Sequence, residues 1–544
     1  MPWNAYPRPR LVRPDWLCLN GPWRYTAGDV SGEILVPFCP ESLLSGIGNS
    51  PAGGVRMEYR RTFSVPDSWR NRRVLLHFGA VSRTADVRVN GSPAVRSENG
   101  YLPFSADVTD LLRPGENELA VYAVNDLSPD HPLGKQKMNR GGMWYTPVSG
   151  IWQTVWLEPV PENRVRSLSV TCGADWAEIR AEGAEDGVLT LDGRDYPLRD
   201  GRVRLSFDAP HPWSPEDPFL YRFALASGED RVESYFALRT VSVRRSGGLP
   251  RICLNGKPYF FHGLLDQGYW SDGLYTPADP EAFKRDILAM KALGFNTLRK
   301  HIKIEPERFY YECDRLGMIV FQDMVSCGEY SFLRDTLLPT AGFVRRNDSR
   351  LHRNPALREN FLCAMDATVR LLGNHPCVCL WTIFNEGWGQ FLADRAYDRL
   401  KSLDGSRPVD SASGWFRPKK TDVESLHIYF QKLHAGKTGL PLLLSEIGGW
   451  SLKIPEHSFN QEKTYGYRKY TDRETFLRDL RGLYLNQVLP LIRRGLCGTV
   501  YTQVSDVEDE TNGLFTFDRE VLKIAPEEFS DIAAALRREM ESCR

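Results

Sequence analysis

Residues 377–384 read CVCLWTIF, a largely apolar run of eight residues that ends abruptly in Asn385 and Glu386. A run of this length and composition is typical of a strand buried on both faces, as in a parallel sheet that helices cover. The run LLL at 442–444 ends in the same way, one residue before Glu446. Each run therefore predicts a buried strand whose end carries a carboxylate.

Outward from these two runs, apolar runs alternate with amphipathic helices from about residue 250 to the end of the chain. In one of these helices Asp279 is the expected N-cap, and Phe283, Ile287 and Met290 form the apolar stripe. Alternating strands and helices over about 290 residues predict one (β/α)₈ TIM barrel, at 250–544.

The first half of the chain has a different rhythm, with short strands of alternating polarity separated by Gly, Pro and Asp. Residues 1–160 predict an N-terminal jelly-roll-like β-sandwich of a sugar-binding type. Residues 161–246 predict a smaller, immunoglobulin-like β-sandwich. The glycine-rich segment 246–250 is the expected boundary before the barrel.

Charge and composition exclude several classes of protein. The 544 residues hold 69 Lys and Arg against 69 Asp and Glu, and this zero net charge argues against a nucleic-acid partner. No apolar run approaches the roughly 18 residues of a membrane span. Residues 1–13 contain no apolar core of a signal peptide, and the eleven cysteines lack metal-ligand spacing. We therefore expect reduced thiols and a cytoplasmic protein.

In a barrel of this kind, functional groups collect at the C-terminal ends of the strands. Glu386 and Glu446 would then face one pocket, and two such carboxylates are the minimal equipment for glycoside hydrolysis. A single Glu after a strand is usually only a charged loop residue. Two strand ends that each carry a Glu, one of them preceded by Asn385, make this explanation weaker. The 14 tryptophans are compatible with a site that stacks sugar rings.

Several motifs resemble those of glycoside hydrolase family 2, which holds β-galactosidases, β-glucuronidases and β-mannosidases. WTIFNE at 381–386 resembles the acid/base motif, and LSEIG at 444–448 resembles the nucleophile motif. Other segments resemble the end of the first β domain, the immunoglobulin-like domain and the second and third barrel strands of that family: GGMWYTPVSGIW at 141–152, PWSPEDP at 212–218, GFNTLR at 294–299 and YECDRLG at 311–317.

The resemblance implies a hydrolase that retains the anomeric configuration. We expect its activity to need no cofactor or metal. Glu446 would be the nucleophile, Glu386 the general acid/base, and Asn385 a ligand of the sugar 2-hydroxyl. Arg299 would favour the ionised form of Glu446.

Further substrate-binding candidates follow other predicted strands. They are Asp266 after the first strand, His427 and Tyr429 after the sixth, and Trp415, Trp450 and Asp506. Each has a plainer reading, as a core histidine, a packed aromatic ring or a loop charge. Asp506 opens the acidic segment DVEDE at 506–510, which could bind hydroxyls or a cation or be a solvated loop. The polar loop GKQK at 134–137 is the part of the sandwich expected to reach over the barrel mouth.

The sequence also departs from the family pattern. The stretch ETNGL at 510–514 lacks the lysine of the Asn-x-Lys clamp for sugar carboxylates, and the charges around it are negative. Residues 299–305 read RKHIKIE instead of the common Arg-x-x-His-x-Pro, and residues 322–324 read QDM without the usual acidic pair. These differences indicate a less typical branch and a neutral sugar.

We therefore expect an exo-acting, retaining β-glycosidase whose partner is a carbohydrate or glycoconjugate, with a β-galactoside as the best candidate. A β-glucuronidase, galacturonidase or arabinosidase of the same family is the alternative. An endo-acting relative and a non-catalytic carbohydrate-binding protein remain as further readings. A homo-oligomer is an expectation from the family.

Overall fold

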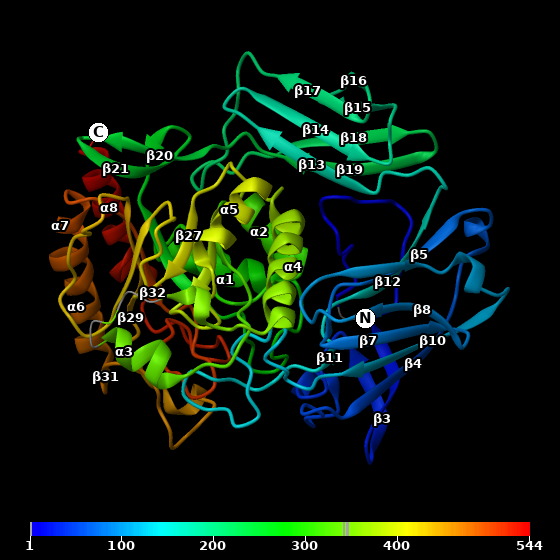
Figure 1. Cartoon of the computed structure of the whole chain (residues 1–544), viewed down its shortest axis with the longest axis horizontal. Helices are drawn as coiled ribbons and strands as arrows, with labels where there is room; N and C mark the ends of the chain where they lie inside the picture. Colours follow the sequence, from blue (N-terminus) through cyan, green and yellow to red (C-terminus); the bar gives the residue numbers. More distant parts are fainter. Residues whose placement is uncertain (1–2, 341–342, 344–346, 544) are drawn as a thin grey trace.

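The computed structural model describes residues 3–340, 343 and 347–543. Its second half is a barrel of eight strands in which all the pairings found are parallel (Figure 1). The strands in their order around the sheet are β27 (Val409–Ser413), β26 (Val378–Asn385), β25 (Ile319–Asp323), β24 (Thr297–Lys300), β23 (Phe261–Asp266), β32 (Leu496–Thr502), β29 (Leu442–Gly448) and β28 (Glu424–Ile428). The sheet comes close to closure between β27 and β28, where the hydroxyls of Ser413 and Ser425 lie 3.2 Å apart.

Helices surround this sheet, as the alternating pattern predicts. They are α1 (Glu281–Ala292), α2 (Glu307–Leu316), α3 (Leu338–Thr340), α4 (Pro355–Leu372), α5 (Ala393–Leu403), α6 (Arg473–Leu483), α7 (Leu489–Ile492) and α8 (Ser530–Glu541). In α1 the carboxylate of Asp279 accepts a hydrogen bond from the Ala282 backbone, 3.1 Å away, and Phe283, Ile287 and Met290 are buried. The expected cap and apolar stripe of this helix are therefore confirmed.

The N-terminal part is a sandwich of two antiparallel sheets. One sheet holds β3 (Val30–Val36), β2 (Gly21–Ala27), β4 (Arg56–Ser64), β10 (Glu116–Val124), β7 (Thr84–Val89) and β8 (Ser92–Ser97). The other holds β1 (Leu17–Cys18), β12 (Val155–Val160), β5 (Arg73–Phe78) and β9 (Phe104–Asp107), and a short pair joins β6 (Val81–Ser82) to β11 (Gly150–Ile151). The alternating residues Ala85, Val87 and Val89 of β7 face the core between the sheets, because neighbouring side chains of a strand point to opposite faces.

A second, smaller pair of sheets lies above the barrel and the sandwich in Figure 1. One is made of β13 (Ser167–Cys172), β14 (Trp176–Glu182) and β17 (Arg202–Ser206), and the other of β16 (Arg194–Leu198), β15 (Gly187–Leu191), β18 (Tyr221–Ser227) and β19 (Asp230–Phe236). They enclose a separate apolar core. The boundaries that we assigned from the sequence stay an interpretation.

The glycine-rich segment at 246–250 is part of a hairpin. It joins β20 (Val241–Ser246) to β21 (Leu249–Leu254) in a sheet with β22 (Lys257–Pro258). Gly247 and Gly248 form the turn with φ values of 56° and 79°, a backbone region that favours glycine. A last short pair, β30 (Ser451–Leu452) and β31 (Lys469–Tyr470), lies beyond β29.

A loop of the sandwich reaches the barrel, as predicted for 134–137. The backbone amides of Leu133 and Gly134 both donate to the carbonyl of Ser326, at 2.9 and 3.1 Å. Further along the loop, the Tyr145 hydroxyl donates to the carboxylate of Glu510, which follows β32. These contacts hold residues of the sandwich beside the C-terminal ends of the barrel strands, where the cyan loops meet the barrel in Figure 1.

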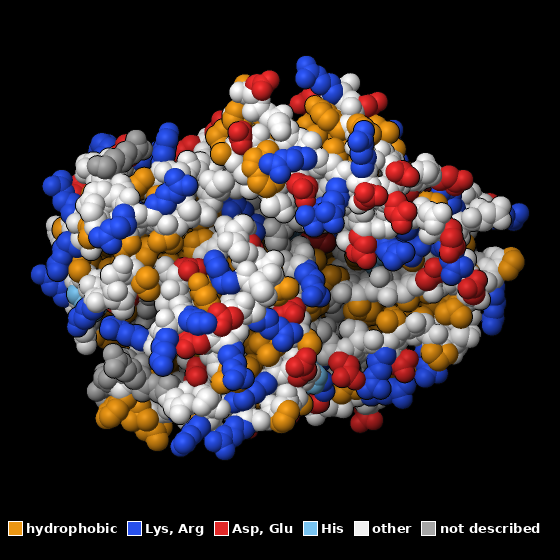
Figure 2. Space-filling model, turned by 45° about the horizontal axis from the view of Figure 1, so that its top comes forward, with side chains coloured by type: hydrophobic (Ala, Val, Ile, Leu, Met, Phe, Trp, Pro, Cys, Tyr) orange, Lys and Arg blue, Asp and Glu red, His pale blue; other side chains and the backbone are white. Residues whose placement is uncertain are grey.

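The molecular surface agrees with the balanced composition. Figure 2 shows basic and acidic side chains interspersed over the face in view. Among the helices of the described residues, none has both the length and the apolar character needed to cross a membrane.

Candidate active site

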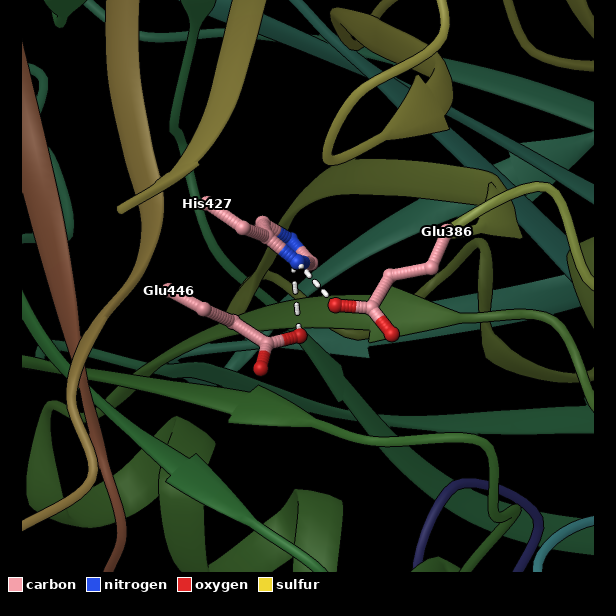
Figure 3. A group of neighbouring side chains, drawn as sticks. All are labelled: Glu386, His427 and Glu446. Atoms are coloured by element: carbon pink, nitrogen blue, oxygen red, sulfur yellow. Dashed lines mark hydrogen bonds and ion pairs between the residues drawn. The ribbon is translucent and has the colours of Figure 1, made fainter. Parts of the chain in front are cut away.

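The two predicted carboxylates lie together at the mouth of the barrel. One oxygen of Glu386, one of Glu446 and a ring nitrogen of His427 are all within 4.8 Å of one another. Figure 3 shows the imidazole between the two carboxylates, with Nδ1 2.7 Å from Glu386 and Nε2 3.4 Å from Glu446. The separation of the carboxylates is close to the ~5–5.5 Å of retaining glycosidases and shorter than the ~6.5–9.5 Å of inverting ones.

The backbone at the end of β26 turns Glu386 towards the opening. Its φ is 51°, in the left-handed region that non-glycine residues seldom adopt, and its amide donates to the carbonyl of Ser413, 2.8 Å away. Such conformations occur where the surrounding structure imposes them, often at functional sites. The Glu386 side chain is 15% exposed, whereas that of Glu446 is 6% exposed. Glu386 is thus the more accessible of the two to solvent and ligand.

Arg299 joins the parts of the site from the end of β24. Its buried guanidinium donates to Asp323 at 3.0 Å, to the side-chain oxygen of Asn385 at 2.8 Å and to Glu446 at 3.0 Å. Because the amide oxygen of Asn385 is engaged by Arg299, the amide nitrogen, a donor, points the other way. The arrangement fixes Asn385 beside the carboxylate pair.

The surroundings of Glu446 favour its ionised form. Burial alone would raise the pKa of this carboxyl, but the opposing charges of His427 and Arg299 outweigh burial and hold the pKa below its usual value. The Tyr429 hydroxyl donates to the second oxygen of Glu446. Glu446 is therefore a hydrogen-bonded, ionised carboxylate, the state that a nucleophile requires.

The structure brings Trp415 to the carboxylate pair and places Trp450 further away. The ring of Trp415 lies edge-on to His427, with 6.0 Å between the ring centroids. Trp450 lines a neighbouring cavity of about 680 Å³ that Tyr429 also borders. The guanidinium of Arg468 lies 5.6 Å from the Trp450 ring centroid. Whether either tryptophan contacts a sugar stays a prediction.

Asp266 and Asp506 are each paired with a lysine. Asp266 accepts a hydrogen bond from Lys300 at 2.7 Å, and Asp506 accepts one from Lys523 at 2.6 Å. In the part of the chain that the structure describes, neither makes a hydrogen bond or ion pair with the carboxylate pair. Their expected role in substrate binding stays a prediction.

Two polar residues near Glu446 were not among the sequence-predicted ones. Asp323, at the end of β25, holds both Arg299 and His301, whose Nδ1 lies 2.6 Å from its carboxylate. Asp323 could have been found from the sequence, because it lies in QDM at the end of a predicted strand. The comparison with the family pattern instead drew attention to the missing acidic pair. His301 is buried, and its pKa is lowered to about 4 by burial together with the charge of Lys135.

Aromatic rings border the side of the site that Glu386 faces. Trp144, from the sandwich loop, packs edge-on against Tyr330 and Trp388, each at 5.2 Å between centroids. Trp388 follows Glu386 by two residues, which places this aromatic cluster next to the end of β26. The sequence showed only that tryptophan is abundant, because these rings come from three separate segments.

The three residues Glu386, His427 and Glu446 could also be considered as metal ligands. However, both oxygens of Glu446 already accept hydrogen bonds, from Arg299 and from Tyr429. The guanidinium 3.0 Å away would also repel a cation. The donor set therefore fits an acid–base pair better than a metal site.

Two segments of the chain match models of a known protein family. Residues 248–438 match the TIM barrel domain of glycosyl hydrolases family 2, and residues 52–183 match the galactose-binding domain-like unit of glycosyl hydrolase 2. A curated relative, the β-galactosidase of Klebsiella pneumoniae (strain 342), is 28% identical over an alignment of 406 positions that covers 67% of this chain and 36% of that protein. The chain thus spans little more than a third of the length of this relative.

Solved structures share the fold over almost the whole chain. A β-D-glucuronidase from Dictyoglomus thermophilum has a TM-score of 0.77 at 17% identity and covers 97% of this chain and 98% of its own. A GH2 β-galacturonidase from Eisenbergiella tayi bound to galacturonate has a TM-score of 0.71 at 20% identity, covering 96% and 97%. At these identities the likeness concerns the fold alone.

Proposed function

Since this chain belongs to glycoside hydrolase family 2, we propose that it is a retaining, exo-acting β-glycosidase that removes a terminal sugar by double displacement. The observation that carries the proposal is the pair Glu386 and Glu446, within 4.8 Å of each other in unequal surroundings. One carboxylate is held ionised by Arg299, and the other is turned towards the opening.

In the first step, Glu446 attacks the anomeric carbon, and the bond between this carbon and the leaving oxygen breaks. The leaving oxygen takes the proton of Glu386, so that a glycosyl ester of Glu446 and an ionised Glu386 remain. In the second step, a water molecule gives a proton to Glu386 and attacks the anomeric carbon. The ester bond breaks, which frees Glu446 and releases the sugar with its original configuration.

Neighbouring residues support these two steps. Asn385, fixed by Arg299, directs its amide nitrogen away from the guanidinium, where it can donate to the sugar 2-hydroxyl. The docked sandwich loop narrows one side of the mouth, which supports an exo-acting enzyme over one that binds the middle of a polymer. The aromatic rings around Trp144 lie on the side from which the leaving group would depart.

For the sugar we propose a neutral β-glycoside, with β-galactoside as the first candidate. The curated relative is a β-galactosidase, and the buried acid Glu510 beside the site would oppose a negatively charged sugar. A uronide or an arabinoside is the alternative. The β-D-glucuronidase and the galacturonate-bound β-galacturonidase that share the fold support the uronide.

Hydrolysis of a panel of nitrophenyl glycosides tests the proposal, with Glu446→Ala as the control. The panel holds β-galactoside, β-glucoside, β-mannoside, β-glucuronide, β-galacturonide and α-L-arabinoside. We expect turnover of a neutral member, none by the variant, and retention of configuration in the first product seen by NMR. A first product of inverted configuration would contradict the mechanism. Binding that survives Glu446→Gln and Glu386→Gln without any turnover would indicate a carbohydrate-binding protein.

We also expect the activity to persist after dialysis against a chelator, because hydrogen bonds from Arg299 and Tyr429 already occupy both oxygens of Glu446. Activity lost on chelation and restored by magnesium or calcium would overturn this expectation.

A further inference from the structure

Two side chains of opposite charge, from distant parts of the chain, lie near the same tyrosine at the mouth of the barrel. Lys135 lies on the sandwich loop, and Glu510 follows β32 of the barrel. Tyr145 lies against both: the Lys135 ammonium is 5.9 Å from the centroid of its ring, and its hydroxyl donates to Glu510. The docking of the loop therefore brings a cation and an anion together at the barrel mouth.

Only one of the two carboxylate oxygens of Glu510 is engaged in hydrogen bonds with the described residues. Its Oε2 accepts hydrogen bonds from Tyr145 and from the side chain of Gln503, which is 3.0 Å away. The other oxygen, Oε1, makes no hydrogen bond to a described residue. It is also not one of the fully buried atoms that lack a partner, so part of it is exposed. A carboxylate with one anchored and one open oxygen is an acceptor prepared for a ligand.

Lys135 stands near the acids without contacting them. It is half-buried and forms no ion pair with the described residues. Burial raises the pKa of Glu510, and the charge of Lys135 opposes this effect. At Glu446 the same charge adds to the larger effects of His427 and Arg299, which lower the pKa. The ammonium therefore acts on both carboxylates without forming an ion pair with either of them.

We propose that Lys135 and Glu510 form a clamp for two adjacent hydroxyl groups of the sugar that Glu446 attacks. The ammonium donates to the oxygen of one hydroxyl, and the carboxylate accepts the proton of the other. An ammonium only donates and a carboxylate only accepts, whereas each sugar hydroxyl does both, so the pair fits a vicinal diol. This inference rests on the proposed function and narrows it to neutral sugars with a free vicinal diol.

A sugar carboxylate is the competing ligand for Lys135. It would find the ammonium on one side, but it would also meet the charge of Glu510, which is 5% exposed and screened little by water. The diol uses both groups favourably, whereas the carboxylate uses one and is repelled by the other. The diol is therefore the ligand that the geometry favours.

The test measures kcat/KM of Lys135→Met and Glu510→Gln on the preferred glycoside and on its monodeoxy analogues at each hydroxyl except the 2-position. On the complete sugar we expect each variant to lose about 10–100-fold, the usual effect of a hydrogen bond to a charged group. On the analogue that lacks the recognised hydroxyl, variant and wild type should agree within about three-fold. The two hydroxyls identified in this way should be neighbours on the ring.

Matched controls change the same charges on the same segments. Arg140→Met removes another cation of the sandwich loop, which lies 3.4 Å from the carboxylate of Glu508. Glu508→Gln removes the charge of an acid that accepts from the Thr146 backbone at 2.9 Å. Both should stay within about three-fold of wild type, which separates the clamp from the docking of the loop.

Two results would overturn the clamp while the proposed function stands. In one, the losses are equal on every deoxy analogue, which would mean that the two residues only position the loop. In the other, a uronide is preferred to its neutral parent and Lys135→Met removes the preference. Absence of turnover by the wild type on every glycoside would refute both proposals, whereas turnover that Glu446→Ala abolishes upholds the proposed function in either case.

Discussion

Two pairs of acids lie at or beyond the ends of barrel strands, and they have different partners. Glu386 and Glu446 contact His427 and, through Glu446, Arg299. Asp266 and Asp506 instead each contact a buried lysine ammonium. The acids of both pairs thus occupy similar positions in the barrel. The side chains that contact each acid determine whether it can react or only stabilise the structure. His427 and Arg299 share their hydrogen bonds among several groups, which leaves the acids beside them able to react. A lysine that pairs directly with an acid neutralises its charge and favours a structural role.

The comparison is clearest between Glu446 and Asp506, which are both almost fully buried. Burial raises the pKa of Asp506 to about 6, although the charge of Lys523 opposes it. The pKa of Glu446 is lowered because His427 and Arg299 together outweigh burial. The cations around Glu446 overcome the cost of desolvation, whereas those around Asp506 do not.

The largest effect is expected for the reactive pair. Glu446→Ala should reduce kcat/KM by at least about 10³-fold on every substrate, because no other group can form the glycosyl ester. Glu386→Ala should be as severe on alkyl glycosides but much milder on dinitrophenyl glycosides, whose leaving group needs no proton. Steady-state kinetics on the two substrate types measures the difference.

Both variants should melt within a few degrees of wild type, which serves as the control for folding. Substantial turnover by Glu446→Ala, or equal losses of Glu386→Ala on both types of leaving group, would contradict the assignment of roles.

The second effect concerns stability. Lys523→Met leaves the carboxylate of Asp506, 1% exposed, without its counter-charge. Breaking a buried pair in this way costs about 3–5 kcal/mol of unfolding free energy at pH 8. Removal of Lys523 raises the pKa of Asp506 above its present value of about 6. The native state then binds a proton that the unfolded state does not, so the loss should shrink as the pH falls through that raised pKa.

Urea denaturation at pH 8 and pH 5 measures this loss. The double variant Lys523→Met with Asp506→Asn should recover most of the stability at pH 8, because no buried charge remains. A double variant as unstable as the single one would show that Lys523 acts through packing and not through its charge.

The sequence predicted the reactive pair because its signal is local. One residue separates each of Glu386 and Glu446 from an apolar run, and Arg299 lies near the end of another strand of the same sheet. The partners of the other acids are remote: Lys300 is 34 residues from Asp266. Lys135 has no local signal at all, since only the docking of the sandwich brings it to the barrel.

A smaller effect is expected from Tyr429→Phe, which removes one hydrogen bond from Glu446. A hydrogen bond to a charged group corresponds to about 10–100-fold in kcat/KM. Loss of this donor destabilises the ionised carboxylate and raises its pKa, so the acidic limb of the pH profile should move to higher pH while the basic limb stays. A loss in rate without a shift of the acidic limb would mean that Tyr429 contacts the sugar and not the nucleophile.

The smallest effect is expected from Asp266→Asn, because Lys300 keeps a second carboxylate, Glu305, 2.8 Å away. The expected loss is about 1–2 kcal/mol of unfolding free energy, less than for Lys523→Met. The charge of Lys300 holds the pKa of Asp266 below its usual value against the effect of burial. The stability that Asp266 supplies is therefore present above its unfolded pKa and lost as the pH falls through the folded one.

Kinetics of the same variant decides whether Asp266 also binds substrate. A structural Asp266 leaves kcat/KM per folded molecule within about three-fold of wild type. A loss of more than about ten-fold with unchanged stability would instead place Asp266 on a sugar hydroxyl. That result would break the comparison, because an acid neutralised by a buried lysine would then also face the ligand.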